Sequence, residues 1–368
     1  MSSFFRALIS RFSFLFSLLS FLTAFGGIQN SFAENLGQLS FEELSLRAGY
    51  FVSEGQNSEF NLNESLIGFS WRLDKNIRSF VGLGGLKLIN SPLHYSSSSS
   101  HEWGLVEAYG EYMTSYGRWR FGLIPLEYAI EGSRRESELE WSRSLLFKRR
   151  VVGLRDYGIS YSIDYEGFYS RWAFHNGEGD GKNARDSRVW MTSSWGWTNF
   201  DKLNFGFSGN TGRTAPIATS VSGDNLAGVD PTQSAKWSMA TFYLHYWTTK
   251  SWSSLLELTW GGREQDEALV AEGRGKFFSG HFDWAYDWSS QMGILLRGDY
   301  FDPNLGVSGD IEREFSLAWS FRSQEGNSRL YLMGTKVLEE GGEKSQINND
   351  LFQIVWHLSS ESFSKKAF

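Results

Sequence analysis

Residues 116–124 read YGRWRFGLI, and a second alternating stretch runs from Ile159 to Asp164. In both stretches apolar and polar side chains alternate with the two-residue period of a β-strand. Residues 125–152 between them have no clean period and carry six basic residues beside five glutamates. Connections of that length inside a domain are usually functional. We therefore predict that residues 125–152 fold into a barrel and narrow its pore.

The same alternation recurs sixteen times along the chain, in stretches of roughly 9–11 residues. The stretches are 44–53, 63–73, 77–89, 101–114, 117–124, 156–164, 167–175, 186–197, 202–210, 236–247, 251–260, 273–288, 291–301, 310–321, 328–337 and 349–358. Eight longer connections alternate with seven short turns, the asymmetry of outer-membrane barrels, whose loops lie outside and whose turns face the periplasm. The sequence predicts an all-β fold: a transmembrane antiparallel β-barrel of sixteen strands with a long, inward-folded third extracellular loop.

The composition agrees with such a barrel. Aromatic residues make up 17% of the chain, yet the mean hydropathy is −0.34. The aromatic side chains recur at every second position beside polar or small residues, which is typical of a wall with lipid outside and water inside. A secreted β-sandwich or β-helix is the rival interpretation, but it does not predict aromatic side chains in phase on one face.

Residues 1–33 have the pattern of a secretory signal peptide. Arg6 and Arg11 precede the apolar run Phe12–Phe25, and Ser31-Phe32-Ala33 places small residues before a cut ahead of Glu34. The alternative is a membrane anchor, for which the apolar run is short. A mature domain of residues 34–368 would hold 33 basic and 42 acidic residues, a net charge of −9. That charge argues against nucleic acid as a partner.

Basic side chains are the candidate pore-lining and solute-binding groups. Arginine donates two parallel hydrogen bonds to a phosphate or carboxylate and keeps its charge, and rings of Arg or Lys select anions in pores. The loop's glutamates could offset them, and charges of both signs could simply keep the lumen wet. The predicted site comprises Arg118, Arg120, Arg134, Arg135, Arg143, Lys148, Arg149, Arg150, Arg155 and Arg297.

Short motifs along the chain resemble the phosphate-selective porin O and P family. They are Phe121-Gly-Leu-Ile-Pro125-Leu, Leu146-Phe147-Lys148-Arg149, Gly153-Leu-Arg155-Asp156-Tyr-Gly158, Ala173–Gly179 and Arg297–Asn304. The resemblance implies sixteen strands, a passive channel with an arginine-lined lumen, and usually a trimer. Members differ in what they pass, so the resemblance implies a porin more firmly than it implies phosphate.

We therefore expect a bacterial outer-membrane porin, a passive channel for small hydrophilic solutes with a weak preference for anions such as phosphate. Its expected partners are lipid, lipopolysaccharide and two further copies of itself, with no cofactor and no metal. An enzyme is disfavoured because the chain has no cysteine, no serine is marked out to join His281 and Asp283, and the six histidines show no metal-ligand spacing. The alternative is a non-conducting structural or adhesive barrel with a plugged lumen.

Overall fold

The computed structural model describes residues 38–53, 59–62, 64–85, 103–149, 151–177, 189–199, 202–213, 235–249, 251–265, 274–305, 309–339 and 350–360. The expected signal peptide (1–33), Arg150 of the predicted site and the tail beyond residue 360 lie outside these ranges. Among the described residues, no helix has the length and apolar character needed to span a membrane.

One antiparallel sheet contains every described strand, and strands that follow one another in sequence are neighbours in space. The strands are β1 (Gln38–Ser53), β2 (Glu59–Leu62), β3 (Leu66–Arg72), β4 (Ile77–Gly85), β5 (Trp103–Met113), β6 (Arg118–Pro125), β7 (Arg155–Tyr165), β8 (Phe168–His175), β9 (Trp190–Asn199), β10 (Leu203–Arg213), β11 (Ala235–Thr249), β12 (Trp252–Gln265), β13 (Arg274–Asp287), β14 (Met292–Asp302), β15 (Glu312–Arg322), β16 (Ser328–Glu339) and β17 (Leu351–Ser359).

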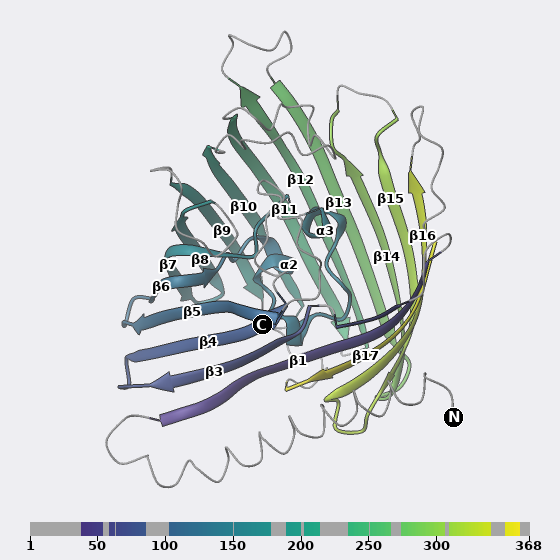
Figure 1. Cartoon of the computed structure of the whole chain (residues 1–368), viewed down its shortest axis with the longest axis horizontal. Helices are drawn as coiled ribbons and strands as arrows, with labels where there is room; N and C mark the ends of the chain where they lie inside the picture. Colours follow the sequence, from purple (N-terminus) through teal and green to yellow (C-terminus); the bar gives the residue numbers. More distant parts are fainter. Residues whose placement is uncertain are drawn as a thin grey trace.

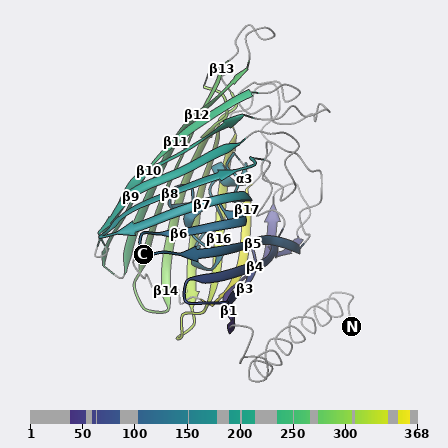
Figure 2. The same ribbon diagram turned by 90° about the vertical axis from the view of Figure 1, so that its left-hand side faces the viewer.

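The sheet closes on itself through its first and last strands, which lie side by side in Figure 1. Residues Ser45–Ser53 of β1 pair with β17, while β1 also pairs with β2 and β3. Since β2 and β3 are two segments of the same barrel strand, the wall has sixteen strands, as predicted. Closure leaves no unpaired sheet edge, so every strand can meet its backbone hydrogen bonds inside a lipid bilayer. Figure 2 shows the wall from the side.

Side chains alternate between the two faces of the wall as the sequence predicts. On β10, Phe205 and Phe207 are 39% and 56% exposed on the outside, whereas Asn204 and Ser208 are buried within the barrel. Trp195 and Trp197 on β9 also face outward. An apolar exterior around a largely polar interior is the pattern of a wall that meets lipid.

The turn between β7 and β8 illustrates how the short connections form. Glu166 and Gly167 link the strands and both have positive φ, 48° and 89°. A two-residue turn with positive φ at both positions matches the right-handed twist of the two strands. The predicted turn at residues 165–166 is thus present, one residue further along the chain.

Residues 126–154, hereafter loop L3, connect β6 to β7 and turn into the barrel, where α2 and α3 lie within the ring of strands in Figure 1. L3 contains α2 (Ala129–Ser133), a 3₁₀ turn η2 (Glu136–Glu138) and α3 (Leu145–Lys148). These helices were not predicted, because residues 125–152 show no clean period in the sequence. Helices of three to five residues are too short to show a 3.6-residue period, and contacts with the wall stabilise them instead.

Candidate pore constriction

L3 enters the lumen at Tyr128, which is fully buried. Its hydroxyl group is 2.6 Å from Thr241 Oγ1 on β11, and the next backbone N–H, at Ala129, donates to Ser208 Oγ on β10 at 2.8 Å. Ala129 has φ = 54°, a left-handed conformation that non-glycine residues rarely adopt. The wall therefore holds the chain in a strained turn at the position where the loop changes direction.

The first amides of α2 are bound by a side chain of the wall. Ile130 N and Glu131 N both donate to Glu257 Oε1 on β12, each at 2.8 Å. The first N–H groups of a helix have no partner within the helix, and a carboxylate satisfies them well because it also complements the helix dipole. Glu257 thus caps α2 from the barrel wall.

Apolar packing fixes the rest of L3 against the wall. Ile130, Leu145 and Phe147 lie in a buried cluster with Trp237 of β11 and Phe277 of β13. The rings of these two wall residues stack with centroids 5.2 Å apart. Tyr109 of β5 and Trp190 of β9 also face into the barrel. Both are buried, at 3% and 4% exposure.

Arg143 of L3 and Arg155 at the start of β7 both bind one buried carboxylate of the loop. Arg143 Nη2 and Arg155 Nη2 each lie 2.6 Å from the carboxylate of Glu136. Burial raises the pKa of Glu136, but the two guanidinium groups outweigh burial and bring the pKa down to about 2. Arg143 also donates to the carbonyl oxygens of Glu131 (2.5 Å) and Arg134 (3.2 Å). This group of charges holds the loop in its folded shape.

Further ion pairs join L3 to strands β1, β15 and β16 of the wall. Arg135 contacts Glu43 of β1 at 2.5 Å, and Glu140 contacts Arg329 of β16 at 2.8 Å. Lys148 contacts Glu314 of β15 at 2.5 Å. Arg149 Nε donates to Glu312, also on β15, at 2.7 Å.

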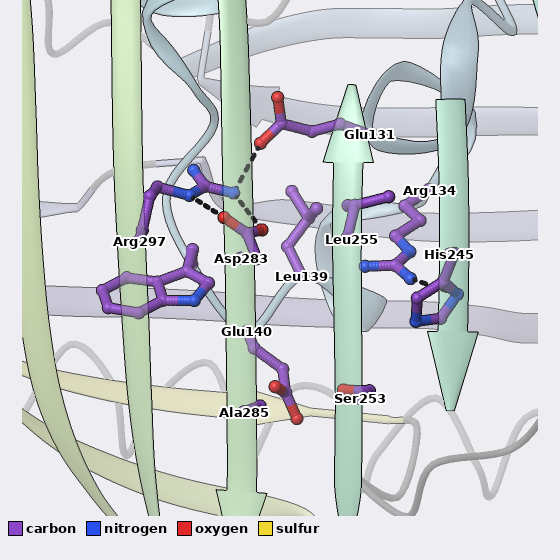
Figure 3. A pocket seen from close by; sticks show the side chains of 11 residues that line it. Glu131, Arg134, Leu139, Glu140, His245, Ser253, Leu255, Asp283, Ala285 and Arg297 are labelled. Carbon is purple, nitrogen blue, oxygen red and sulfur yellow. Dashed lines mark hydrogen bonds and ion pairs between the residues drawn. The ribbon is translucent and has the colours of Figure 1, made fainter. Parts of the chain in front are cut away.

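Arg297 of β14 also joins the wall to L3. Figure 3 shows its guanidinium group between Asp283 and Glu131, at 2.5 Å and 3.0 Å, and Arg134 pointing toward His245. Burial raises the pKa of Glu131, but Arg297 and other neighbours bring it down to about 2. These residues line a small cavity between L3 and strands β11–β14.

A second group lies where β6 leads into the loop. Arg120 contacts Glu111 of β5 at 2.9 Å and Glu127 of L3 at 2.6 Å, and Arg118 lies 3.5 Å from Glu111. Arg171 of β8 approaches Glu127 at 3.1 Å. Burial raises the pKa of Glu127, but Arg171 and Arg120 bring it down to about 2.

The predicted site residues fall into two groups. Four are buried at 2–8% side-chain exposure: Arg120, Arg143, Arg155 and Arg297. Four others keep about a third of their side chain exposed: Arg118, Arg135, Lys148 and Arg149. Arg134 is partly buried beside His245, and Arg150 lies outside the described residues.

The acidic partners on β1 and β5 were missed in the sequence analysis. Glu43, Glu107 and Glu111 are 1–2% exposed and bind the predicted arginines. Glu107 and Glu111 are in phase with Tyr109, so the alternation alone could have placed them in the lumen.

Asp156, His175 and Thr192 form a buried chain of hydrogen bonds in the order carboxylate, imidazole, hydroxyl, which is the order of groups that activate a nucleophile. His175 Nδ1 is 2.8 Å from Asp156, and its Nε2 is 2.9 Å from Thr192 Oγ1. Thr192 is 2% exposed and also accepts a hydrogen bond from Asn210 at 2.8 Å. Asp156 further accepts from Gly177 N at 2.5 Å. The contacts fix the start of β7 to β8 and β9, and the covered hydroxyl group has no room to meet a substrate.

No protein-family model and no curated protein matches the sequence. Among solved structures, the trimer form of OmpT, an outer membrane protein of Vibrio cholerae folded in vitro, has a TM-score of 0.61 at 13% identity, over 88% of this chain and 99% of that chain. The outer membrane channel DcaP of Acinetobacter baumannii has a TM-score of 0.61 at 7% identity, over 89% of this chain and 98% of that chain. The anion-selective porin from Comamonas acidovorans has a TM-score of 0.58 at 12% identity, over 88% and 100%. At these identities the likeness shows the fold, and the fold is that of the sixteen-strand bacterial outer-membrane barrels.

Proposed function

We propose that the protein is a porin of the bacterial outer membrane, a passive channel through which small hydrophilic solutes diffuse, with L3 as its constriction. The observation that carries this proposal is the position of L3, which is folded inside a closed barrel and presents charged side chains there. The apolar exterior supports lipid as the surroundings of the wall, with lipopolysaccharide in the outer leaflet. The shared fold with an outer membrane channel and an anion-selective porin adds further support.

For the solute we propose small anions, with a weak preference. Lys148 and Arg149 keep 35% and 38% of their side chains exposed, so a passing phosphate or carboxylate could reach them. The preference is weak because each of these cations has a carboxylate partner, Glu314 or Glu312. Residual attraction then comes from their exposed N–H groups rather than from net charge.

Conductance of the purified protein in a planar bilayer tests the channel directly. Discrete open steps are expected. In chloride, micromolar phosphate should lower the current, and Arg149→Glu should abolish that effect. Open steps without any response to phosphate would retain the porin and discard phosphate as its solute.

A plugged structural or adhesive barrel is the second candidate, and one observation favours it. L3 is held by apolar packing against Trp237 and Phe277 as well as by ion pairs, as a plug that stays in the lumen would be. If that candidate is correct, the purified barrel will be silent in the bilayer and will conduct only after L3 is removed.

We also propose that three copies assemble, as the trimer form of the Vibrio cholerae protein does. Cross-linking in detergent should give a ladder that stops at three chains. A single band at one chain would overturn the assembly while leaving the channel proposal in place.

A further inference from the structure

Three potential metal ligands from distant parts of the chain meet where α2 docks on the wall. They are Glu131 of α2, Glu257 of β12 and His281 of β13, and they are 1%, 2% and 4% exposed. One donor atom of each lies within 4.8 Å of the others. Glu257 and His281 face each other because they are register partners in the pairing of β12 with β13.

A second observation points to a ligand at this position. Glu257 Oε1 accepts hydrogen bonds from two backbone amides, but among the described residues nothing donates to its buried Oε2. His281 Nε2 is likewise buried without a hydrogen-bond partner in the described part of the chain. A buried carboxylate oxygen and a buried ring nitrogen are costly to leave unpaired, and a cation between them would satisfy both.

We propose that Glu131, Glu257 and His281 form a binding site for a divalent transition metal such as Zn²⁺, which joins loop L3 to the barrel wall. An imidazole with carboxylates suits zinc, whereas calcium and magnesium take oxygen ligands. An ion central to three atoms at most 4.8 Å apart lies no more than about 2.8 Å from each, and zinc requires about 2.0–2.2 Å. A shift of less than an ångström brings the three side chains to zinc distance, and water can complete the shell.

The surrounding charges accommodate a divalent ion. The two carboxylates balance its charge, while Arg297, 3.0 Å from Glu131, is itself balanced by Asp283 at 2.5 Å and Asp299 at 3.9 Å. Neighbouring groups also orient the ligands. Ser144 N donates to Glu131 Oε1 at 2.9 Å, and hydrogen bonds of this kind fix metal-binding carboxylates in place.

The site does not depend on the proposed channel activity, because it concerns how L3 is held. A bound metal would connect α2 to two wall strands at once. It would therefore resist release of the loop, whether the lumen conducts or is plugged.

Zinc binding to the complete, refolded barrel tests the proposal. After treatment with EDTA, the protein competes with a chromogenic chelator for added Zn²⁺. The wild type should bind one equivalent tightly, and His281→Gln and Glu257→Gln should each weaken that binding at least about tenfold. His357→Gln serves as the matched control, because His357 is a buried wall histidine outside the cluster, hydrogen-bonded to Ser45.

Heat-modifiable mobility on a gel confirms that each variant has folded. His281→Cys offers a thiolate in place of the imidazole and should bind zinc again, which separates lost coordination from lost folding. If a glutamine variant does not refold, the cysteine variant and the remaining glutamine variant decide the outcome. Equal zinc affinity in the wild type and in His281→Gln, or no stoichiometric zinc in the wild type, overturns the proposal.

Discussion

Arg143 and Arg149 were predicted to share one role, yet their surroundings in L3 differ. Arg143 is 2% exposed and binds Glu136 together with two loop carbonyl oxygens. Arg149 is 38% exposed and binds Glu312 at the surface of the lumen. The sequence could not separate them, because in a segment without a period nothing indicates which side chain meets a partner from another part of the chain.

At the residue scale this difference predicts unequal effects of the same substitution. Arg143→Met leaves two loop carbonyl oxygens and part of the Glu136 carboxylate unpaired, so it should lower the free energy of unfolding by about 3–5 kcal/mol. Arg149→Met removes a partly exposed pair and should cost at most about 1 kcal/mol. Urea unfolding of the refolded barrel, followed by tryptophan fluorescence, measures both. Equal losses would contradict the buried role of Arg143.

The pH dependence of loop docking follows from three carboxylates. The folded-state pKa values of Glu127, Glu131 and Glu136 lie at about 2, below an ordinary value of 4.5, because the neighbouring guanidinium groups outweigh burial. Depressed acid pKa values add stability that is complete above the unfolded value and is lost as pH falls through the folded value. L3 should therefore stay docked down to about pH 4.5 and loosen between pH 4.5 and 2.

Current noise recorded in the bilayer at stepped pH measures this loosening. Glu136→Gln mimics the protonated side chain, so its channel should already be noisy at neutral pH and should respond less to acid. Loosening of the wild type that begins above pH 5 would show that other groups control the loop.

At the element scale, the two-residue alternation predicted the strands of the barrel wall but not the structure of L3 inside the barrel. The predicted tight turns at 74–76, 115–116 and 289–290 lie between the strands they were assigned to, because a short connection leaves the chain few choices. L3 differs because its short helices depend on Glu257 and on the aromatic residues of β11 and β13. Those contacts join positions far apart in the chain, such as Ile130 and Glu257, which are 127 residues apart, and no local pattern encodes them.

In the motif that leads into L3, position 122 of β6 requires glycine for steric reasons. Its φ is 127°, and a Cβ atom there would lie 2.3 Å from the carbonyl oxygen of Ala108 on β5. Gly122→Ala should therefore lower the free energy of unfolding by about 1–3 kcal/mol. Gly110→Ala on β5 is the matched control, since its Cβ would meet no atom within 4 Å. Comparable refolding midpoints in urea for the two variants would refute the steric argument.

Removal of L3 tests whether this element sets the width of the channel. Pro125 and Arg155 are register partners at the ends of β6 and β7, so a short glycine-serine linker can replace residues 129–148 without strain on the wall. Single-channel conductance should then rise severalfold, because the loop no longer occupies the lumen. A shortened channel with wild-type conductance would place the constriction elsewhere in the barrel.

At the scale of the whole molecule, the net charge says little about selectivity. Charges farther apart than about 8 Å are screened at physiological salt, so the groups at the constriction decide which ions pass. There Lys148 and Arg149 face Glu314 and Glu312, two cations against two anions. A pair about 4 Å apart at an effective dielectric near 20 interacts by about 4 kcal/mol, so removing one side of this balance should change selectivity strongly.

Neutralising the two carboxylates and neutralising the two cations should shift the reversal potential in a salt gradient in opposite directions. Glu312→Gln combined with Glu314→Gln removes two negative charges beside Lys148 and Arg149 and should strengthen the preference for anions. Lys148→Gln combined with Arg149→Gln removes two positive charges beside Glu314 and Glu312 and should turn the channel toward cations. Since both double variants remove the same two ion pairs, any loosening of the loop is common to them, and only the sign of the remaining charge differs. Shifts of the same sign in both variants would mean that these four residues lie away from the path of the ions.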